Sequence, residues 1–233
     1  MVPSVLAPTA LVDSDHPAVA SFAARHAQGT TEAGRAVALY YAVRDGFRYD
    51  PYRIDLSSHG MKASTVLAKG YGWCVPKATL LAAACRAAGI PARLGFADVR
   101  NHLSTERMRQ VMGTDTFFWH GFTEIWIDGA WRKATPAFNL ELCDRLGLLP
   151  LGFNGRDDSL YHPFDRHGHR HMEYVAQRGS YDDVPLGRII ADFAEHYPAW
   201  RTQIEAMQRS DFLADVANEV PGVPSEAAAR LDE

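Results

Sequence analysis

The chain has 233 residues and is 47% hydrophobic, 11% aromatic and 22% charged, a composition typical of a globular protein and unlike that of a disordered or fibrous one. This length is sufficient to bury a sizeable core, and we expect a single domain. The formal net charge of -4 provides no basic face, so the sequence predicts neither a nucleic-acid partner nor binding to an anionic membrane.

Cysteine usage and the N-terminus indicate a compartment. Three cysteines form an odd set without a C-x-x-C motif, which favours a reducing cytoplasm. The first residues, M-V-P-S-V-L-A-P-T-A, lack a basic leader before an apolar run, and no stretch approaches the roughly 20 apolar residues of a membrane span. We therefore expect a soluble, cytoplasmic protein; its oligomeric state does not follow from the sequence.

The first half of the chain contains two predicted helices. Residues 31–45 carry apolar side chains at helical spacing, and the following G-F-R-Y-D-P-Y turns extended. Residues 56–73 are rich in Ser, Gly and Lys and are predicted to be a loop. The second helix is predicted to begin near Cys74 and to end at Gly89, because Pro76 is tolerated only in the first turn and glycine favours the position after a helix.

A hairpin sheet is predicted next. Residues 92–99 and 117–127 read as strands, separated by a polar stretch at 101–115 that is helical or irregular. Asp128-Gly129 is a strong signal for a two-residue hairpin turn, and 130–135 returns as the paired strand. The order of helices, antiparallel sheet and further helices predicts an α+β fold.

The C-terminal part is less regular. Residues 140–185 are predicted to be a loop-rich segment that wraps the sheet, and 186–217 to form one or two helices. Residues 221–233 read as a frayed tail. We therefore predict one domain over 1–220, with its core at about 31–139.

Cys74 is the candidate nucleophile. At a helix start, unpaired backbone N–H groups and the positive end of the helix dipole stabilise a thiolate and can hold an oxyanion. Cys85 lies three turns along the same helix and Cys143 follows the sheet in an apolar context, so both are expected to be buried small hydrophobes. A cysteine at a helix start also occurs as a structural residue, so position alone leaves both roles open.

His120 is the candidate base, because a nucleophilic thiol needs a group that takes its proton and later returns it to a leaving group. Strand alternation predicts His120 on one face with Phe118 and Phe122, and Phe117 and Trp119 on the other. An imidazole among aromatic side chains is also compatible with a buried structural histidine.

The combined motifs resemble a known family. G-W-C before an alanine-rich helix, R-A-A-G-I-P-A-R before a strand, and H-G-F-T-E-I-W-I-D-G-A-W closing on T-P resemble the transglutaminase-like superfamily of papain-type cysteine enzymes. The resemblance covers about residues 35–139. It implies a papain-like core with a nucleophile helix on an antiparallel sheet, Cys74 as nucleophile and His120 as base. It also implies hydrolysis or acyl transfer at an amide, ester or thioester through an acyl-enzyme; no cofactor is predicted.

The third position of the triad departs from the family. An aspartate is usual four residues after the hairpin tryptophan, where it fixes the imidazole tautomer and stabilises its cation, and Thr135 occupies that place here. With a two-residue turn, His120 pairs with Ala137, and Thr135 is diagonal to His120 on the same face. We rank Thr135 first, although its hydroxyl can orient a ring without offsetting its charge.

Other residues remain candidates for orienting His120. Asn139 is the other diagonal neighbour in this register and would resemble the papain arrangement. An acid from elsewhere, Asp157 or Asp158, could reach in. Glu124 is four residues along the same strand and therefore about 13 Å from His120, which excludes it.

A histidine cluster lies in Y-H-P-F-D-R-H-G-H-R-H-M-E-Y and comprises His162, His167, His169 and His171. In an extended chain, three of these imidazoles fall on one face, which suits zinc or another divalent metal. Loop histidines are usually solvated, however, and no matching Cys or His set at a standard spacing occurs elsewhere. No metal site is therefore predicted.

Three functions follow from these observations. The first is a cysteine-dependent hydrolase or acyltransferase that uses Cys74 and His120 on a small-molecule or peptide substrate. The second is a metal-dependent enzyme on the same fold, which uses His120 or the histidine cluster. The third is a catalytically degenerate binding protein, prompted by the missing aspartate.

Overall fold

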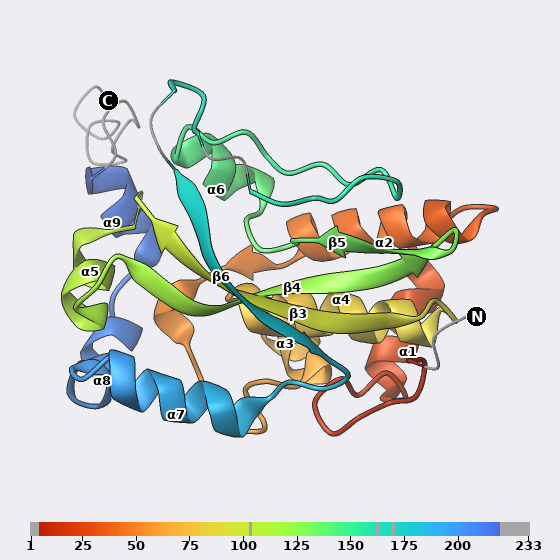
Figure 1. Cartoon of the computed structure of the whole chain (residues 1–233), viewed down its shortest axis with the longest axis horizontal. Helices are drawn as coiled ribbons and strands as arrows, with labels where there is room; N and C mark the ends of the chain where they lie inside the picture. The colour runs from red at the N-terminus through yellow and green to blue at the C-terminus, as the bar shows by residue number, and fades with distance from the viewer. Residues whose placement is uncertain (1–4, 103, 162–163, 169–170, 220–233) are drawn as a thin grey trace, which may run out of the picture.

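The computed structural model describes residues 5–102, 104–161, 164–168 and 171–219. A four-stranded antiparallel sheet with the order β5-β4-β3-β6 lies across the molecule, with helices packed around it (Figure 1). Its strands are β3 (Ala92–Asn101), β4 (Thr116–Ile127), β5 (Ala130–Ala134) and β6 (Met172–Tyr181). The predicted α+β class with a helix on an antiparallel sheet is thus confirmed.

The helices precede, interrupt and follow this sheet. They are α1 (Pro17–His26), α2 (Glu32–Gly46), α3 (Ala63–Lys69), α4 (Cys74–Ala87), α5 (Glu106–Met112), α6 (Leu140–Arg145), α7 (Leu186–His196), α8 (Trp200–Gln208) and α9 (Phe212–Glu219). A short 3-10 helix, η1 (Pro51–Arg53), follows the two-residue strand β1 (Arg48–Tyr49), which pairs in parallel with β2 (Tyr71–Gly72). No helix among the described residues is long and apolar enough to cross a bilayer.

Helix α4 is the centre of the core and contacts α1, α2, α3, β3 and β4. Every residue from its start to Arg86 is buried, including the polar Lys77, Thr79 and Arg86. The Thr123 hydroxyl of β4 donates to the Ala78 carbonyl at 2.9 Å. Gly121 allows β4 to approach the start of the helix, because a Cβ at this position would lie 3.0 Å from the Val75 Cα.

Lys77 holds the first turn of α4 in place. Its side chain is fully buried, and its ammonium donates to the carbonyls of Arg44 (2.9 Å), Phe47 (2.5 Å) and Ala137 (2.7 Å). Burial lowers the pKa of Lys77 to about 7, whereas the three carbonyl oxygens stabilise the charged form. One ammonium therefore joins the end of α2 and the segment after β5 to the helix that begins at Cys74.

Several predicted elements agree with the structure. The predicted helices at 31–45 and from Cys74 correspond to α2 and α4, and Gly89 has the positive φ of +77° that favours glycine. The Asp128-Gly129 turn is confirmed by the pairing of Ile127 with Ala130.

Other expectations were wrong. The predicted loop at 56–73 contains α3, and the structure adds a helix, α1, before the predicted core. The segment 140–185 does more than wrap the sheet, because it contains α6 and supplies the edge strand β6. Three helices, α7 to α9, take the place of the predicted one or two within 186–217. The predicted tail at 221–233 lies outside the described residues.

Candidate active site

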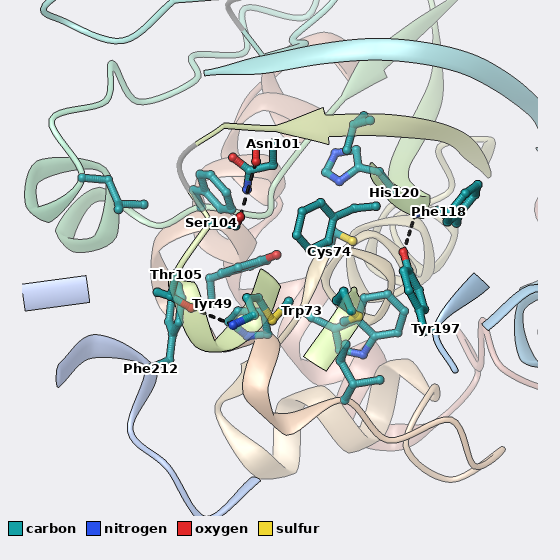
Figure 2. A pocket seen from close by; sticks show the side chains of 18 of the residues that line it. Tyr49, Trp73, Cys74, Asn101, Ser104, Thr105, Phe118, His120, Tyr197 and Phe212 are labelled. Atoms are coloured by element: carbon teal, nitrogen blue, oxygen red, sulfur yellow. Dashed lines mark hydrogen bonds between the residues drawn. The ribbon is translucent and has the colours of Figure 1, made fainter. Parts of the chain in front are cut away.

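Cys74 and His120 line the same pocket, at the end of the sheet where α4 begins (Figure 2). The pocket encloses about 800 Å³ of space, including the part that is open to solvent. Its walls come from β1, η1, α4, β3, α5, β4, α7 and α9, with further residues between these elements. Segments from both halves of the chain therefore surround Cys74 and His120.

Cys74 is the first residue of α4 and is 7% exposed. Burial raises the pKa of its thiol to about 11, although the backbone N–H groups of Gly121, Val75 and Cys74 itself interact with the sulfur and act in the opposite direction. First-turn N–H groups have no acceptor within their helix. The start of α4 therefore holds donors that could turn from the sulfur to an oxyanion.

His120 lies on β4 and is 5% exposed. Burial, and secondarily the neighbouring His171, lowers the pKa of the imidazole to about 4. Its Nε2 is buried and makes no hydrogen bond within the described part of the chain. The rings of Tyr161 and Tyr174 lie 5.5 Å and 6.3 Å from the imidazole, centroid to centroid. His120 is therefore neutral at pH 7, which is the form that a proton acceptor requires.

A bulge in β4 determines where His120 lies. Ala97 of β3 pairs with His120 while Val99 pairs with Phe117, so β4 carries one extra residue across this interval. Within it, Trp119 has a φ of +63°, which is strained for a bulky side chain. Phe117 and His120 consequently both line the pocket, and the predicted strict alternation of faces was wrong across the bulge.

Charged side chains from three other elements hold the bulge. Asp98 accepts a hydrogen bond from the Trp119 backbone N–H at 3.2 Å, and Asp192 accepts one from the indole N–H at 2.8 Å. Arg178 forms ion pairs with both carboxylates, and its guanidinium lies 4.9 Å from the Trp119 ring centroid. Backbone strain of this kind persists only where surrounding contacts over-determine it. The network therefore fixes the residue directly before His120.

A family model described as the transglutaminase-like superfamily matches residues 20–136, which include α4, β4 and the pocket residues Cys74 and His120. The chain belongs to the transglutaminase-like superfamily. This confirms the family that the motif order between residues 35 and 139 resembled.

Solved structures of a "putative cysteine protease" from Cytophaga hutchinsonii and of a "putative protease" from Parabacteroides distasonis are similar to this transglutaminase-like chain, with TM-scores of 0.48 and 0.37. The sequence identities are 16% and 19%, over 77% and 54% of this chain. The matches cover 46% and 26% of those proteins, so the chain spans less than half the length of either. No curated protein matches it.

Thr135 remains the predicted third member of a triad with Cys74 and His120 in this transglutaminase-like protein. No hydrogen bond joins Thr135 to His120. The β5 ladder ends at Ala134, and the Thr135 N–H donates instead to the Ser159 carbonyl at 3.2 Å. The predicted pairing of His120 with Ala137 is therefore not formed. The Thr135 hydroxyl is buried near the Tyr174 phenol, whose pKa burial raises to about 12 against a lowering effect of Thr135.

The alternative orienting residues have other partners. The Asn139 side-chain oxygen accepts the Tyr49 backbone N–H at 3.1 Å. Asp157 accepts from the Asn154 amide at 2.9 Å, and Asp158 accepts the Lys133 backbone N–H at 2.9 Å; both carboxylates are exposed. Glu124, excluded by distance along the strand, forms an ion pair with Arg93 at 2.6 Å.

The histidine cluster is divided in the structure of this superfamily member. His171 is buried and lines the pocket, 5.5 Å from the Tyr161 ring centroid, whereas His167 is exposed. His162 and His169 lie outside the described residues. Among the residues that are described, no three potential ligands come together as a metal site.

Sequence reasoning missed the aromatic surroundings of His120 and the network around Trp119. Tyr174 and Arg178 lie on β6, an edge strand whose residues are largely exposed, so its alternating pattern is weak. Asp98 is a carboxylate within the apolar strand β3, but its role depends on a bulge in a different strand. The only local signal was the polar residue in an otherwise apolar run, L-G-F-A-D-V.

Proposed function

We propose that this protein is a cysteine-dependent hydrolase or acyltransferase that forms an acyl-enzyme on Cys74 with His120 as its base. The observation that carries the proposal is the shared pocket, in which a cysteine at a helix start, contacted by backbone N–H groups, lies with a neutral imidazole. Membership of the transglutaminase-like superfamily supports this reaction class. Thr135 belongs to the proposal as a positioning residue.

The chemistry proceeds in two steps. His120 accepts the thiol proton as the Cys74 sulfur bonds to the carbonyl carbon, and the carbonyl π electrons move to oxygen, which N–H groups at the start of α4 stabilise. The tetrahedral intermediate collapses, the carbonyl re-forms, and the leaving group departs with the proton from the imidazolium. Water or an amine then attacks the acyl-enzyme, transfers a proton to His120 and returns the thiol.

Substitution at the two residues tests the proposal. We expect Cys74→Ala to abolish formation of an acyl-enzyme from 4-nitrophenyl butanoate, and His120→Ala to slow it by about 10²-fold or more, the usual contribution of a general base. Intact-protein mass spectrometry with peptide mapping identifies the acylated residue. Cys85→Ala is the matched control, since Cys85 is fully buried in α4 away from the pocket. Acylation that persists in Cys74→Ala, at a residue other than Cys74, would contradict the proposal.

A binding protein without catalysis is the second candidate. It is favoured by one observation, the buried Nε2 of His120 that lacks a carboxylate partner within the described residues. In that case the wild-type protein would be acylated no faster than free N-acetylcysteine, and His120→Ala would change nothing.

The cellular location and the number of domains are also proposals. We propose a reducing, cytoplasmic location, because Cys74, Cys85 and Cys143 are all free thiols and all buried. Cell fractionation of the tagged full-length protein tests this, and recovery from an oxidising extracellular fraction would contradict it. A single domain over residues 1–220 is tested by limited proteolysis, in which two stable fragments would be the contrary result.

A further inference from the structure

We propose that the pocket beside Cys74 receives an uncharged, apolar acyl group, either an aliphatic chain or an aromatic ring. The acid portion of the ester, amide or thioester would then enter the pocket, and the leaving group would remain towards solvent. This inference rests on the proposed acyl-enzyme chemistry and specifies its substrate class.

The pocket offers no carboxylate, ammonium or guanidinium to a substrate. Its lining among the described residues contains no Lys, Arg, Asp or Glu, and of its two histidines, His120 and His171, burial lowers the pKa of His120 to about 4. Moving a charged group from water into such surroundings is unfavourable unless it is paired. A carboxylate or ammonium on the acyl group would therefore be excluded, whereas methylene groups and rings would gain by leaving water.

Two hydroxyl groups of the lining already have protein partners. The Tyr197 hydroxyl accepts the Phe118 N–H at 2.7 Å and donates to the Thr116 carbonyl at 3.3 Å. The Thr105 hydroxyl bonds to the Tyr52 phenol at 2.7 Å and accepts the Met108 N–H at 3.3 Å. Recognition of a peptide backbone requires a row of free donors and acceptors. These engaged hydroxyls favour an acyl chain over an extended peptide.

Part of the pocket wall, which we call the far wall, comes from the C-terminal helices. Figure 2 shows Phe212 and Thr105 towards one end of the pocket, Phe118 and Tyr197 towards the other, and Cys74 between them. Phe212 lines this end, and its ring packs against that of Tyr52 at 5.2 Å, centroid to centroid. Several lining residues lie beyond the family-matched segment 20–136, namely Phe138, Leu146, His171, Phe193, Tyr197 and Phe212. The selectivity is therefore a property of this chain's own C-terminal part.

A substrate series tests the class. Acylation of the wild-type protein is measured with 4-nitrophenyl acetate, butanoate, hexanoate and octanoate, each relative to N-acetylcysteine. We expect the relative rate to rise about fourfold per added methylene until the pocket is filled, as burial of one methylene predicts. Pentanoyl and 3-carboxypropanoyl esters form the charge comparison, and the charged one should react at least tenfold more slowly.

A pair of isomers distinguishes the two sides of the scissile bond. S-ethyl octanethioate and S-octyl ethanethioate are isomers. The eight-carbon chain is the acyl group in the first and belongs to the leaving group in the second. We expect faster modification of Cys74 by S-ethyl octanethioate. A preference for S-octyl ethanethioate would overturn the assignment of the pocket to the acyl group.

A wall variant tests the geometry independently of folding. Phe212→Ala should shift the preferred chain length to longer esters, a shift that general destabilisation would not produce. Leu149→Ala, at an exposed side chain outside the pocket, is the control and should leave the preference unchanged. An unshifted preference in Phe212→Ala would overturn the placement of the far wall.

The failures of the two proposals differ. If the esters acylate Cys74 of the wild-type protein at rates that do not depend on chain length or charge, the acyl-enzyme chemistry stands and the substrate class is overturned. If no member of the series acylates Cys74 faster than N-acetylcysteine, the proposed function itself is overturned, and the substrate class with it.

Discussion

Cys74 and His120 form a neutral pair at rest, because burial raises the pKa of the thiol to about 11 and lowers that of the imidazole to about 4. A thiolate–imidazolium pair would require the two values in the opposite order. In the proposed mechanism, the thiol proton therefore moves to His120 as the sulfur attacks, so the thiolate forms during the reaction and is not present in the free protein.

This protonation state predicts the pH dependence of alkylation. The rate at which iodoacetamide modifies Cys74 should rise about tenfold per pH unit from pH 7 to 10, because the thiolate fraction grows until the pH reaches the pKa near 11. The mass of the labelled protein over time gives the rate. Cys74→Ala serves as the control for Cys85 and Cys143, whose burial also raises their thiol pKa values, to about 12 and 11. A flat rate between pH 5 and 8 would instead reveal an ion pair.

The pocket residues Cys74 and His120 could be predicted from the sequence as candidates for the site, but the side chains that surround them could not. Their positions at a helix start and on a long strand are local features, which the G-W-C and D-G signals locate. The ring neighbours Tyr161 and Tyr174 come from positions 41 and 54 residues beyond His120. No local pattern reports such contacts, so the buried and unpaired Nε2 could not be foreseen.

Among the elements, α4 depends on an unusual support. Lys77 supplies the donors for three carbonyls, one near the end of α2, one just after it and one after β5. Removing a buried donor leaves its acceptors unsatisfied, at about 1 to 3 kcal/mol each, and this outweighs the relief of burying one charge less. The first turn of α4 and its neighbours are therefore coupled through one side chain.

Lys77→Met tests this coupling. We expect the free energy of unfolding at pH 7, measured by urea denaturation, to fall by about 3 kcal/mol. Wild-type stability should also rise with pH above 7, because the unfolded lysine, with its ordinary pKa of 10.5, retains a proton that the folded one loses. Lys69→Met is the matched control, since the Lys69 ion pair with Asp55 is partly exposed and worth under about 1 kcal/mol. Equal losses in both variants would contradict the support role.

The elements that the sequence predicted well are those with local start and stop signals. Pro76 and Gly89 bracket α4, and Asp128-Gly129 fixes the β4–β5 turn. Helix α3 was missed because A-S-T-V-L-A-K is short and its centre, S-T-V, consists of weaker helix formers. The bulge at Trp119 could not be predicted, since its stability comes from Asp98, Asp192 and Arg178 on other elements.

Helix α9 connects distant parts of the chain at one end of the pocket. Asp215 of α9 accepts hydrogen bonds from the Tyr52 phenol at 2.8 Å and from Arg107 at 2.7 Å. The same Tyr52 phenol bonds to Thr105 before α5. This clasp joins the N-terminal, middle and C-terminal thirds of the chain at the end of the pocket that Phe212 covers.

Weakening the clasp should loosen one end of the pocket without unfolding the protein. We expect Asp215→Asn to raise the amide hydrogen-exchange rates of α9 by about tenfold, because a hydrogen bond to a charged group contributes about 1.5 kcal/mol or more. Exchange in α4 should stay unchanged. Glu205→Gln is the control, since the Glu205 side chain is 82% exposed and its pair with Arg209 is long, at 3.9 Å. Faster exchange throughout the chain would indicate global destabilisation instead.

The close contact between Gly121 and Val75 has a consequence for inheritance. Every glycine codon becomes an alanine codon by one base change, and the added methyl would press on the Val75 Cα from 3.0 Å. The start of α4 would have to move by a few tenths of an ångström. A single base change in this codon would thus displace the turn that holds Cys74, the residue on which the proposed function depends.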